Sequence, residues 1–274
     1  MRDLEGKTAV VIGGGSGIGR GFAIAAAARS MTVAVADIDG ASAAKTAAEL
    51  VAGGADAFAI ETDATDRERL VELRDDVLAR AGSVALLSNN AGVTFECPLI
   101  EATAADWQWV MEFNLYTAVN ACTVFAPLLC DQGSGHIVNN ASLAGLAVFP
   151  GLGIGLYTAS KFALVAYTEM LRNELAGAGV GVSVLCPSMT RSNLSVTSAR
   201  NRPERYGGPL AAPAGGMPDV PEDQMMSSEE VGRIALEGVI EDRLFVLTHP
   251  ELVGVAEQRS RAMVADCAGT ARPS

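Results

Sequence analysis

Short apolar runs alternate with longer segments along most of the chain. The runs are rich in Val, Ile, Leu and Ala and have the length of strands, whereas the segments between them have the length of helices. Parallel strands covered on both faces are apolar throughout, so the runs predict one parallel sheet of about seven strands. The expected strands are 8–12, 32–36, 57–61, 84–88, 136–140, 180–186 and 245–248.

Several of the segments between strands carry helix signals. Thr65 with Glu68, and Ser227 with Glu230, have the spacing of a capping box, and residues 105–124 form a long helical stretch. Right-handed crossovers would place such helices on both faces of the sheet. The pattern predicts a doubly wound α/β fold of the Rossmann type, whose ligands bind at the carboxyl ends of the strands.

One region interrupts this alternation. Residues 189–226 show no clear hydrophobic period and contain a cluster of Pro and Gly. A connection of this length in a compact domain usually covers a functional site or is mobile. We predict a substrate lid, with disorder without function as the alternative. No repeat or second domain interrupts the pattern, so residues 1–274 are predicted to form a single domain.

Composition and charge exclude several classes of protein. The formal net charge is -12 and no Lys/Arg run reverses it locally, so nucleic acid is not an expected partner. The N-terminus lacks the order of a signal peptide, and Asn120 and Pro127 interrupt the longest apolar stretch, which predicts a soluble protein without a membrane span. Five scattered cysteines without metal-ligand spacing predict reduced thiols, a cytoplasmic location and no bound metal.

A glycine-rich turn follows the first expected strand. The run Gly13-Gly14-Gly15-Ser16-Gly17-Ile18-Gly19 opens an Ala-rich helix. Residues without side chains let the backbone approach a pyrophosphate, and the helix N-terminus supplies free N–H groups and a positive dipole end. We predict a dinucleotide site here, with a tight packing joint as the alternative.

Asp37 extends this site. It ends the second strand, 18 residues after Gly19, close to the spacing of the acidic residue in a dinucleotide site. Its carboxylate can accept both ribose hydroxyls of NAD and would repel a 2'-phosphate, while neither Ser16 nor Ile38 supplies the cation that NADP requires. We therefore predict NAD, with a plain helix cap as the alternative role of Asp37.

Two further strand ends supply small or polar groups. Asp63 and Ala64 follow the third strand, where Asp63 can bond the adenine amine or satisfy backbone N–H groups of a turn. Asn90, Ala91 and Gly92 follow the fourth strand. Asn90 can brace neighbouring strands, while Ala91 and Gly92 allow close approach of the cofactor.

Tyr157 and Lys161 are the strongest candidates for chemistry. They lie four residues apart on one helix face, in a chain with only four tyrosines and three lysines. A phenol with a reference pKa of ~10 is a poor base, but an adjacent ammonium and a nicotinium charge favour phenolate. We predict that Lys161 lowers the pKa of Tyr157 and holds a ribose hydroxyl. The alternative is an aromatic ring packed on a lysine stem.

Ser142 and Asn114 complete the candidate catalytic set. Ser142 follows the fifth strand and can bond the oxygen that Tyr157 protonates or deprotonates, or it can be a cap or turn serine. Asn114 is buried by pattern and needs a partner. It can hold a water that relays protons to Lys161, or bond a helix carbonyl.

These elements resemble the short-chain dehydrogenase/reductase family over essentially the whole chain. The resemblance implies a Rossmann fold, NAD(P) binding, and a homotetramer formed through the helices that hold Asn114 and Tyr157. The matching parts are the turn 13–19, Asp63, the motif 89–92, and the tetrad Asn114, Ser142, Tyr157 and Lys161.

The sequence also departs from that family. Ile12 replaces a Thr before the first glycine, and Ser188 replaces the Gly that follows Pro187. Thr190, Ser192 or the nearby backbone, including Pro187 and Ser188, are the candidates for contact with the carboxamide. The interval from Ser142 to the tyrosine is about two residues longer than usual, which predicts a bulge at 146–156 beside the substrate.

The expected substrate pocket is apolar. Ligand sites take the polarity of their ligands, so we predict a bulky, uncharged, hydrophobic secondary alcohol or ketone. The expected walls are Phe95, Val148, Phe149, Leu152, Met189, Tyr206, Met225 and Met226. Residues 183–207 and 248–251 are similar to enzymes that oxidise benzylic alcohols of lignin-derived aryl ethers, and steroid-like or other cyclic alcohols are alternatives.

Other functions fit the same fold. An epimerase or dehydratase is one alternative, although no nucleotide-sugar motif favours it. A sensor or scaffold that binds NAD without turnover is another, although such proteins usually lose the tyrosine or the lysine. His136 and His249 are interpreted as structural.

Overall fold

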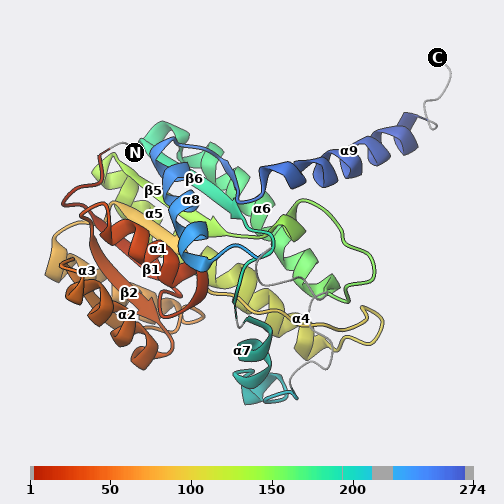
Figure 1. The fold of residues 1–274 in the computed structure, drawn as a ribbon, viewed down its shortest axis with the longest axis horizontal. Coiled ribbons are helices and arrows are strands. Elements are labelled where there is room, and N and C mark those ends of the chain that lie inside the picture. Colours follow the sequence, from red (N-terminus) through yellow and green to blue (C-terminus); the bar gives the residue numbers. More distant parts are fainter. Residues whose placement is uncertain (1–2, 193, 212–224, 269–274) are drawn as a thin grey trace.

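The computed structural model describes residues 3–192, 194–211 and 225–268. Its centre is a parallel sheet of seven strands in the order β3-β2-β1-β4-β5-β6-β7 (Figure 1). The strands are β1 (Thr8–Ile12), β2 (Thr32–Asp37), β3 (Ala57–Glu61), β4 (Leu86–Asn89), β5 (Gly135–Asn140), β6 (Val180–Cys186) and β7 (Phe245–Leu247). The predicted doubly wound sheet is confirmed, with strand ends shifted by one or two residues.

Helices cover both faces of the sheet, which explains why the strands are apolar throughout. Val11 and Val35 pack with α1 (Gly17–Ala27), α2 (Gly40–Ala52) and α8 (Ser228–Ile240). The neighbouring residues Val10 and Ala34 point to the opposite face. That face is covered by α3 (Arg67–Ala81), α5 (Thr117–Gln132) and α6 (Gly155–Leu175).

Two glycines let α1 and α8 approach closely. A Cβ added to Gly21 would lie 1.9 Å from the carbonyl oxygen of Ser228, and one added to Gly232 would lie 2.2 Å from the carbonyl carbon of Gly21. No real Cβ tolerates such distances, so any side chain would separate the helices. The Gly-rich composition therefore serves helix packing as well as the predicted turn.

The helix caps differ in part from the prediction. The predicted cap at Thr65 is wrong: Asp66 caps α3 by accepting from the Glu68 amide at 2.9 Å. The hydroxyl of Thr65 instead donates to Asp63 at 2.8 Å. The predicted cap at Ser227 is confirmed, since its hydroxyl accepts from the amide of Glu230 at 3.1 Å.

The predicted helical stretch 105–124 lies within a longer helical run. It comprises α4 (Ala104–Met111), a π-helical turn (Glu112–Tyr116) and α5. The run of 29 residues is long and apolar enough to span a membrane, but half of its most apolar window is buried inside the molecule. Asn120 there donates to the carbonyl of Thr65 at 3.2 Å. This burial is typical of a core helix.

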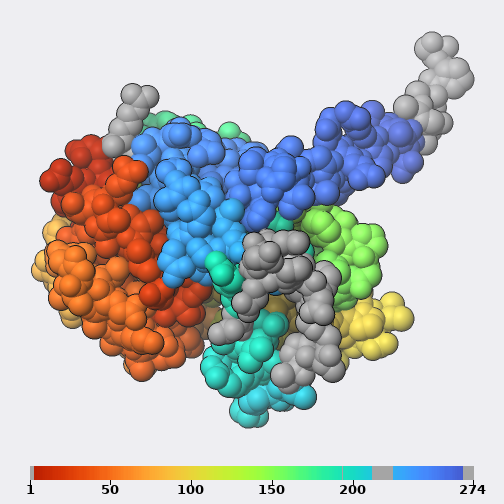
Figure 2. Space-filling view, viewed as in Figure 1, coloured from red at the N-terminus to blue at the C-terminus, as the bar shows by residue number. Residues whose placement is uncertain are grey.

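The predicted lid, 189–226, has structure that the sequence pattern did not indicate. It contains α7 (Leu194–Arg200) and a 3-10 turn (Glu204–Tyr206), whereas residues 212–224 lie outside the described part. Backbone hydrogen bonds join the two ends of the region. The amide of Arg191 donates to the carbonyl of Met226, and the amide of Met226 donates to the carbonyl of Met189. The final helix α9 (Val253–Ala268) stands away from the rest of the surface (Figure 2).

Candidate functional site

The glycine turn presents an uncapped helix end. α1 begins at Gly17, and neither the side chain of Ser16 nor an acidic residue of the first turn caps it. Gly17 has a φ of +50°, with nothing within 4 Å of the position of a Cβ. Gly13 has a φ of +72°, and a Cβ there would lie 2.8 Å from the amide nitrogen of Ala91. Free N–H groups beside a bare backbone fit a pyrophosphate.

Asp37 lies against this turn. One carboxylate oxygen accepts from the amide of Gly15 at 2.9 Å, and the other accepts from the amide of Asp39 at 3.0 Å. Burial raises the pKa of the Asp37 carboxyl, and these bonds oppose the rise. The alternative role as a helix cap is wrong, because Asp39 caps α2. Each oxygen of Asp37 retains a lone pair for a ribose hydroxyl.

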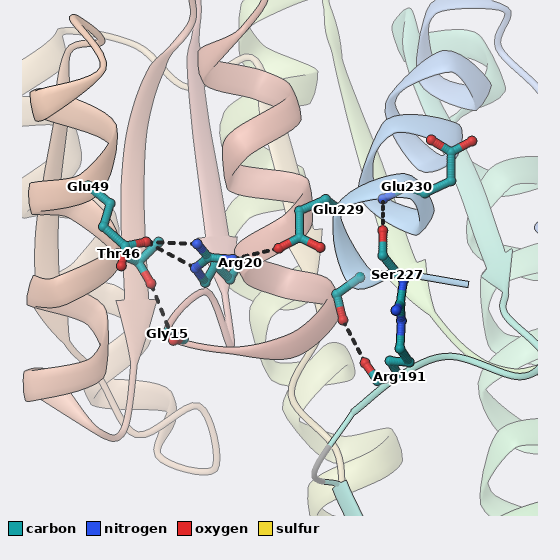
Figure 3. Close-up of polar contacts among 9 residues, drawn as sticks. Gly15, Arg20, Thr46, Glu49, Arg191, Ser227, Glu229 and Glu230 are labelled. Carbon is teal, nitrogen blue, oxygen red and sulfur yellow. Dashed lines mark hydrogen bonds and ion pairs between the residues drawn. The ribbon is translucent and has the colours of Figure 1, made fainter. Parts of the chain in front are cut away.

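Side chains from neighbouring helices hold the turn in place (Figure 3). The hydroxyl of Thr46 donates to the carbonyl of Gly15 at 3.2 Å. Arg20 on α1 bridges Glu49 on α2 and Glu229 on α8, with N–O distances of 2.8 Å in both ion pairs. Both ion pairs of the Arg20 guanidinium are therefore with residues of α2 and α8.

The remaining predicted cofactor positions line the same edge. Asp63 accepts from the amide and the hydroxyl of Thr65, so it satisfies a backbone N–H group of the turn, which was one of its two expected roles. Asn90 donates to the carbonyl of Ile12 and to Ser88, which braces β1 and β4 as expected. Ile38 directly follows Asp37, and its side chain is 58% exposed. An apolar surface here fits an adenine ring.

The catalytic candidates meet at the carboxyl end of β5. Ser142 follows that strand and caps the 3-10 turn Leu143–Gly145, while Tyr157 and Lys161 lie on the first turns of α6. The side chain of Ser142 interacts with the phenol of Tyr157, and the hydroxyl of Ser142 donates to the carbonyl of Pro187 at 3.5 Å. The ammonium of Lys161 donates to the carbonyl of Asn140 at 2.8 Å and lies 5.6 Å from the Tyr157 ring centroid. The structure thus brings the three residues together.

The electrostatics at Tyr157 differ from the expectation. Burial raises the pKa of the phenol, and the hydrogen bond with Ser142 opposes part of this rise. The ammonium of Lys161 is itself buried, which lowers its pKa to about 8. The predicted lowering by Lys161 is therefore absent here, because the ammonium bonds a backbone carbonyl and burial dominates both groups.

Asn114 lies in the π-helical turn and is fully buried. Its side chain accepts from the amide of Val93 at 2.6 Å and donates to the carbonyl of Val93 at 2.9 Å and the hydroxyl of Ser160 at 2.9 Å. The alternative of a bond to a helix carbonyl is therefore wrong. Asn114 therefore connects the loop after β4 to α6 at Ser160, the residue directly before Lys161.

The loop after β6 lies beside the same edge. The carbonyl of Pro187 accepts from the amide of Leu143 at 2.8 Å, and the amide of Ser188 donates to the hydroxyl of Thr248 at 3.3 Å. The hydroxyl of Thr190 donates to the carbonyl of Ser188 at 3.1 Å. These bonds fix the backbone of the candidate carboxamide contacts, Pro187, Ser188 and Thr190, next to Ser142.

The predicted substrate residues differ in exposure. Val148 is 61% exposed, while Phe95, Phe149, Leu152, Met189, Met225 and Met226 are partly buried. Tyr206 is buried in a cluster with Val93, Trp109 and Leu156. The expected bulge at 146–156 connects to the loop after β4, since the amide of Cys97 donates to the carbonyl of Gly153 at 2.9 Å.

Two other features bear on the choice of site. A cavity of about 650 Å³ lies at the amino ends of the strands, lined by Lys7, His136, Arg172 and Asp242 among others, and includes none of the predicted site residues. Burial lowers the pKa of His136 to about 3, and its ring bonds the hydroxyl of Ser183 at 2.8 Å. Within the described ranges, no group of three or more His, Cys, Asp or Glu side chains is placed to hold a metal.

Sequence reasoning missed two buried charges in the site region, Arg202 and Asp106, whose side chains pair at 2.6 Å. A signal for Asp106 existed, because Thr103 and Asp106 have capping-box spacing and form that box in the structure. Arg202 lies in the Pro/Gly-rich region, where no period indicated burial.

Comparisons with known proteins point to dehydrogenases. A family model described as short chain dehydrogenase matches residues 7–203. The chain is 32% identical to 1-deoxy-11-beta-hydroxypentalenate dehydrogenase of Streptomyces exfoliatus, over 90% of this chain and 85% of that protein. It is also 32% identical to the C alpha-dehydrogenase of Sphingobium sp. strain SYK-6, over 96% and 87%.

Solved structures agree with these relatives. A short chain dehydrogenase/reductase from Burkholderia phymatum in complex with NAD has a TM-score of 0.86 and 33% identity, with both chains covered completely. The apo form of LigD from Sphingobium sp. strain SYK-6 has a TM-score of 0.81 and 27% identity, covering 99% of this chain and 100% of that one.

Proposed function

Since the chain belongs to the short-chain dehydrogenase family, we propose that it interconverts a bulky, hydrophobic secondary alcohol and its ketone with NAD as cofactor. The observation that carries this proposal is the meeting of Ser142, Tyr157 and Lys161 at the carboxyl end of β5. We take the whole chain as one catalytic unit, with 189–226 next to the substrate, and the homotetramer stays a prediction.

Tyr157 would act as the general acid/base. In alcohol oxidation its phenolate oxygen takes the hydroxyl proton, and in ketone reduction the phenol returns a proton to the carbonyl oxygen. The hydroxyl of Ser142 donates to the carbonyl of Pro187 at 3.5 Å in the structure, and its one proton would turn from that long bond to the same substrate oxygen. Lys161 supplies a buried positive charge beside the phenol ring, and Asn114 fixes the loop after β4 against α6.

The residues of the glycine turn fit a dinucleotide. The uncapped N-terminus of α1 would hold the pyrophosphate, Asp37 the ribose hydroxyls of the adenosine half, and Ile38 the adenine face. NAD, when bound, supplies the hydride acceptor in oxidation. The Burkholderia phymatum relative, solved in complex with NAD, supports this assignment.

The decisive experiment measures NADH formation against a panel of hydrophobic secondary alcohols, with the corresponding ketones and NADH in the reverse direction. An increase in NADH absorbance that requires both the enzyme and the alcohol supports the proposal. An NAD-binding sensor would bind the cofactor without turnover. An epimerase or dehydratase would convert its substrate without net NADH formation.

The first prediction concerns pH. Because burial raises the pKa of Tyr157, the phenol is protonated at neutral pH. Below that pKa, kcat/KM for alcohol oxidation at saturating NAD should rise up to about tenfold for each pH unit. Ketone reduction uses the protonated phenol and should fall at alkaline pH. Two flat profiles would contradict the role of Tyr157.

The second prediction concerns the choice of cofactor. Asp37→Ala removes the carboxylate proposed to bond the ribose hydroxyls, so the affinity for NAD should fall at least about tenfold, the equivalent of one charge-assisted hydrogen bond. The affinity for NADP should rise or stay unchanged, because repulsion of its phosphate is removed. Fluorescence titration with NADH and NADPH measures both. The matched control is Asp56→Ala, at an exposed carboxylate that accepts a hydrogen bond from the hydroxyl of Thr32 at 2.8 Å. Equal losses for both cofactors would contradict the assignment.

A further inference from the structure

Residues 194–210, here named the α7 segment, are fixed to the body at several points. The hydroxyl of Ser198 accepts from the amide of Thr94, in the loop after β4, at 3.0 Å. Within the segment, the amide of Leu210 donates to the carbonyl of Ala199 at 2.9 Å. Figure 1 shows α7 on the side of the molecule away from α9, and the 3-10 turn Glu204–Tyr206 that follows α7 contacts α4. This part of the predicted lid is therefore anchored.

A buried ion pair forms the main anchor. Arg202 on the α7 segment and Asp106 on α4 pair at 2.6 Å, with side chains that are only 6% and 8% exposed. Arg202 also donates to the carbonyl of Tyr206. Asp106 accepts in addition from the amide and the hydroxyl of Thr103, so the same carboxylate starts α4 and holds the α7 segment.

Two aromatic rings enclose the guanidinium. Its central carbon lies 4.9 Å from the ring centroid of Trp109 and 5.6 Å from that of Phe95. The two rings pack edge to face, with centroids 5.7 Å apart. Cation–π contact in a desolvated setting adds directional attraction to the ion pair. Arg202 therefore sits in one defined position between the loop after β4 and α4.

The same cluster reaches the catalytic helix. Trp109 and Tyr206 pack with Val93 and with Leu156, which is fully buried and directly precedes Tyr157. The side chain of Asn114 in turn forms two hydrogen bonds with the backbone of Val93. A displacement of the α7 segment would therefore open the packing beside the proposed general acid/base.

Stability alone does not account for this arrangement. Desolvation of two charges often costs as much as their attraction returns, so apolar residues of similar size can be equally stable there. The Nε of Arg202 and the Nε1 of Trp109 are also buried without a hydrogen-bond partner among the described residues. Such incomplete satisfaction is unfavourable, whereas a charged pair fixes one relative position of two elements.

We infer that Arg202, through its buried pair with Asp106, positions the α7 segment as a wall that favours bulky substrates over small ones. This inference rests on the proposed function. The bulky substrate gains from contact with a wall held in place, while a small alcohol reaches Tyr157 without touching it. Arg202 is thus a positioning residue, distinct from the residues that touch the reacting atoms.

The test compares the wild type with Arg202→Met/Asp106→Asn, which removes both charges while Asn still accepts the bonds from Thr103. The matched control is Arg205→Met. Arg205 lies on the same segment and pairs with Glu112 at 3.2 Å, but its side chain is 52% exposed. Hydrogen exchange of amides 194–210, thermal midpoints, NADH affinity and kcat/KM for benzhydrol and isopropanol are measured for each protein.

In the double variant, exchange across the α7 segment should accelerate about tenfold or more, because local opening no longer breaks the pair. The preference for benzhydrol over isopropanol should fall about tenfold, while NADH affinity and kcat/KM for isopropanol stay within about twofold. Arg205→Met should match the wild type. Unchanged exchange and unchanged preference would overturn the inference, as would equal losses for both alcohols, which indicate a purely structural role.

The single variant Arg202→Lys provides a second check. It retains a positive charge opposite Asp106 but lacks the planar guanidinium that lies against the rings of Trp109 and Phe95. Its substrate preference should lie between those of the wild type and the double variant. If the wild type oxidises neither alcohol, the proposed function fails for these substrates, while hydrogen exchange still decides whether the pair positions the segment.

Discussion

Tyr157→Phe is expected to lower kcat/KM in both directions by about 100- to 10,000-fold, the range that a positioned general acid/base contributes. The substitution removes only the hydroxyl that interacts with Ser142 and leaves the ring beside Lys161. Steady-state rates at saturating NAD and NADH measure the loss. Affinity for NADH should remain within about twofold, because the ring and the lysine are unchanged.

The control for this variant is Tyr116→Phe. Tyr116 lies at the end of the π-helical turn and is 53% exposed, so loss of its hydroxyl should leave the rate unchanged. If Tyr157→Phe retained the activity of the wild type, another group would have to transfer the proton. If it lost NADH affinity to the same extent as turnover, the tyrosine would be a binding residue.

Gly19→Ala is expected to be the most damaging substitution in the glycine turn. A Cβ at this position would lie 2.0 Å from the carbonyl oxygen of Gly13 and 3.2 Å from the Cβ of Asn90. Since both neighbours belong to the fixed turn and its brace, α1 has to move away. Overpacking of this kind costs about 1–3 kcal/mol. Each kcal/mol lowers the Tm by roughly 2–4 °C in a protein of this size class.

The displaced helix end should also lower NAD affinity at least about tenfold, because its N–H groups no longer converge on the pyrophosphate. Thermal denaturation and NADH titration measure the two effects separately. Gly177→Ala is the matched control, since a Cβ there meets nothing within 4 Å. A Gly19→Ala protein with normal NADH affinity would show that the turn is only a packing joint.

The candidate site was predicted in its chemistry more completely than in its electrostatics. Tyr157 and Lys161 share a helix face because of their spacing, and strand ends converge at one edge of a parallel sheet, so both follow from local patterns. The raised pKa of Tyr157 and the lowered pKa of Lys161 arise from burial. Burial depends on the packing of other elements around α6, which spacing does not contain.

Local sequence determined the order and type of the elements. Apolar runs of strand length give strands with two buried faces. The glycines of residues 13–19 permit the backbone angles of the turn whatever the rest of the chain does. The position of Asp37 at the end of β2 follows from the same pattern, because the order of strands in a doubly wound sheet places β2 beside β1.

Tertiary structure decided which distant charges met. Arg202 and Asp106 are 96 residues apart and lie in segments with no shared period, yet they form the buried pair that anchors the α7 segment. The same holds for Arg20, which joins α1 to α2 and α8, and for the bonds of Asn114 to Val93. Periodicity reports the environment along one element, whereas an ion pair between elements depends on how the whole chain packs.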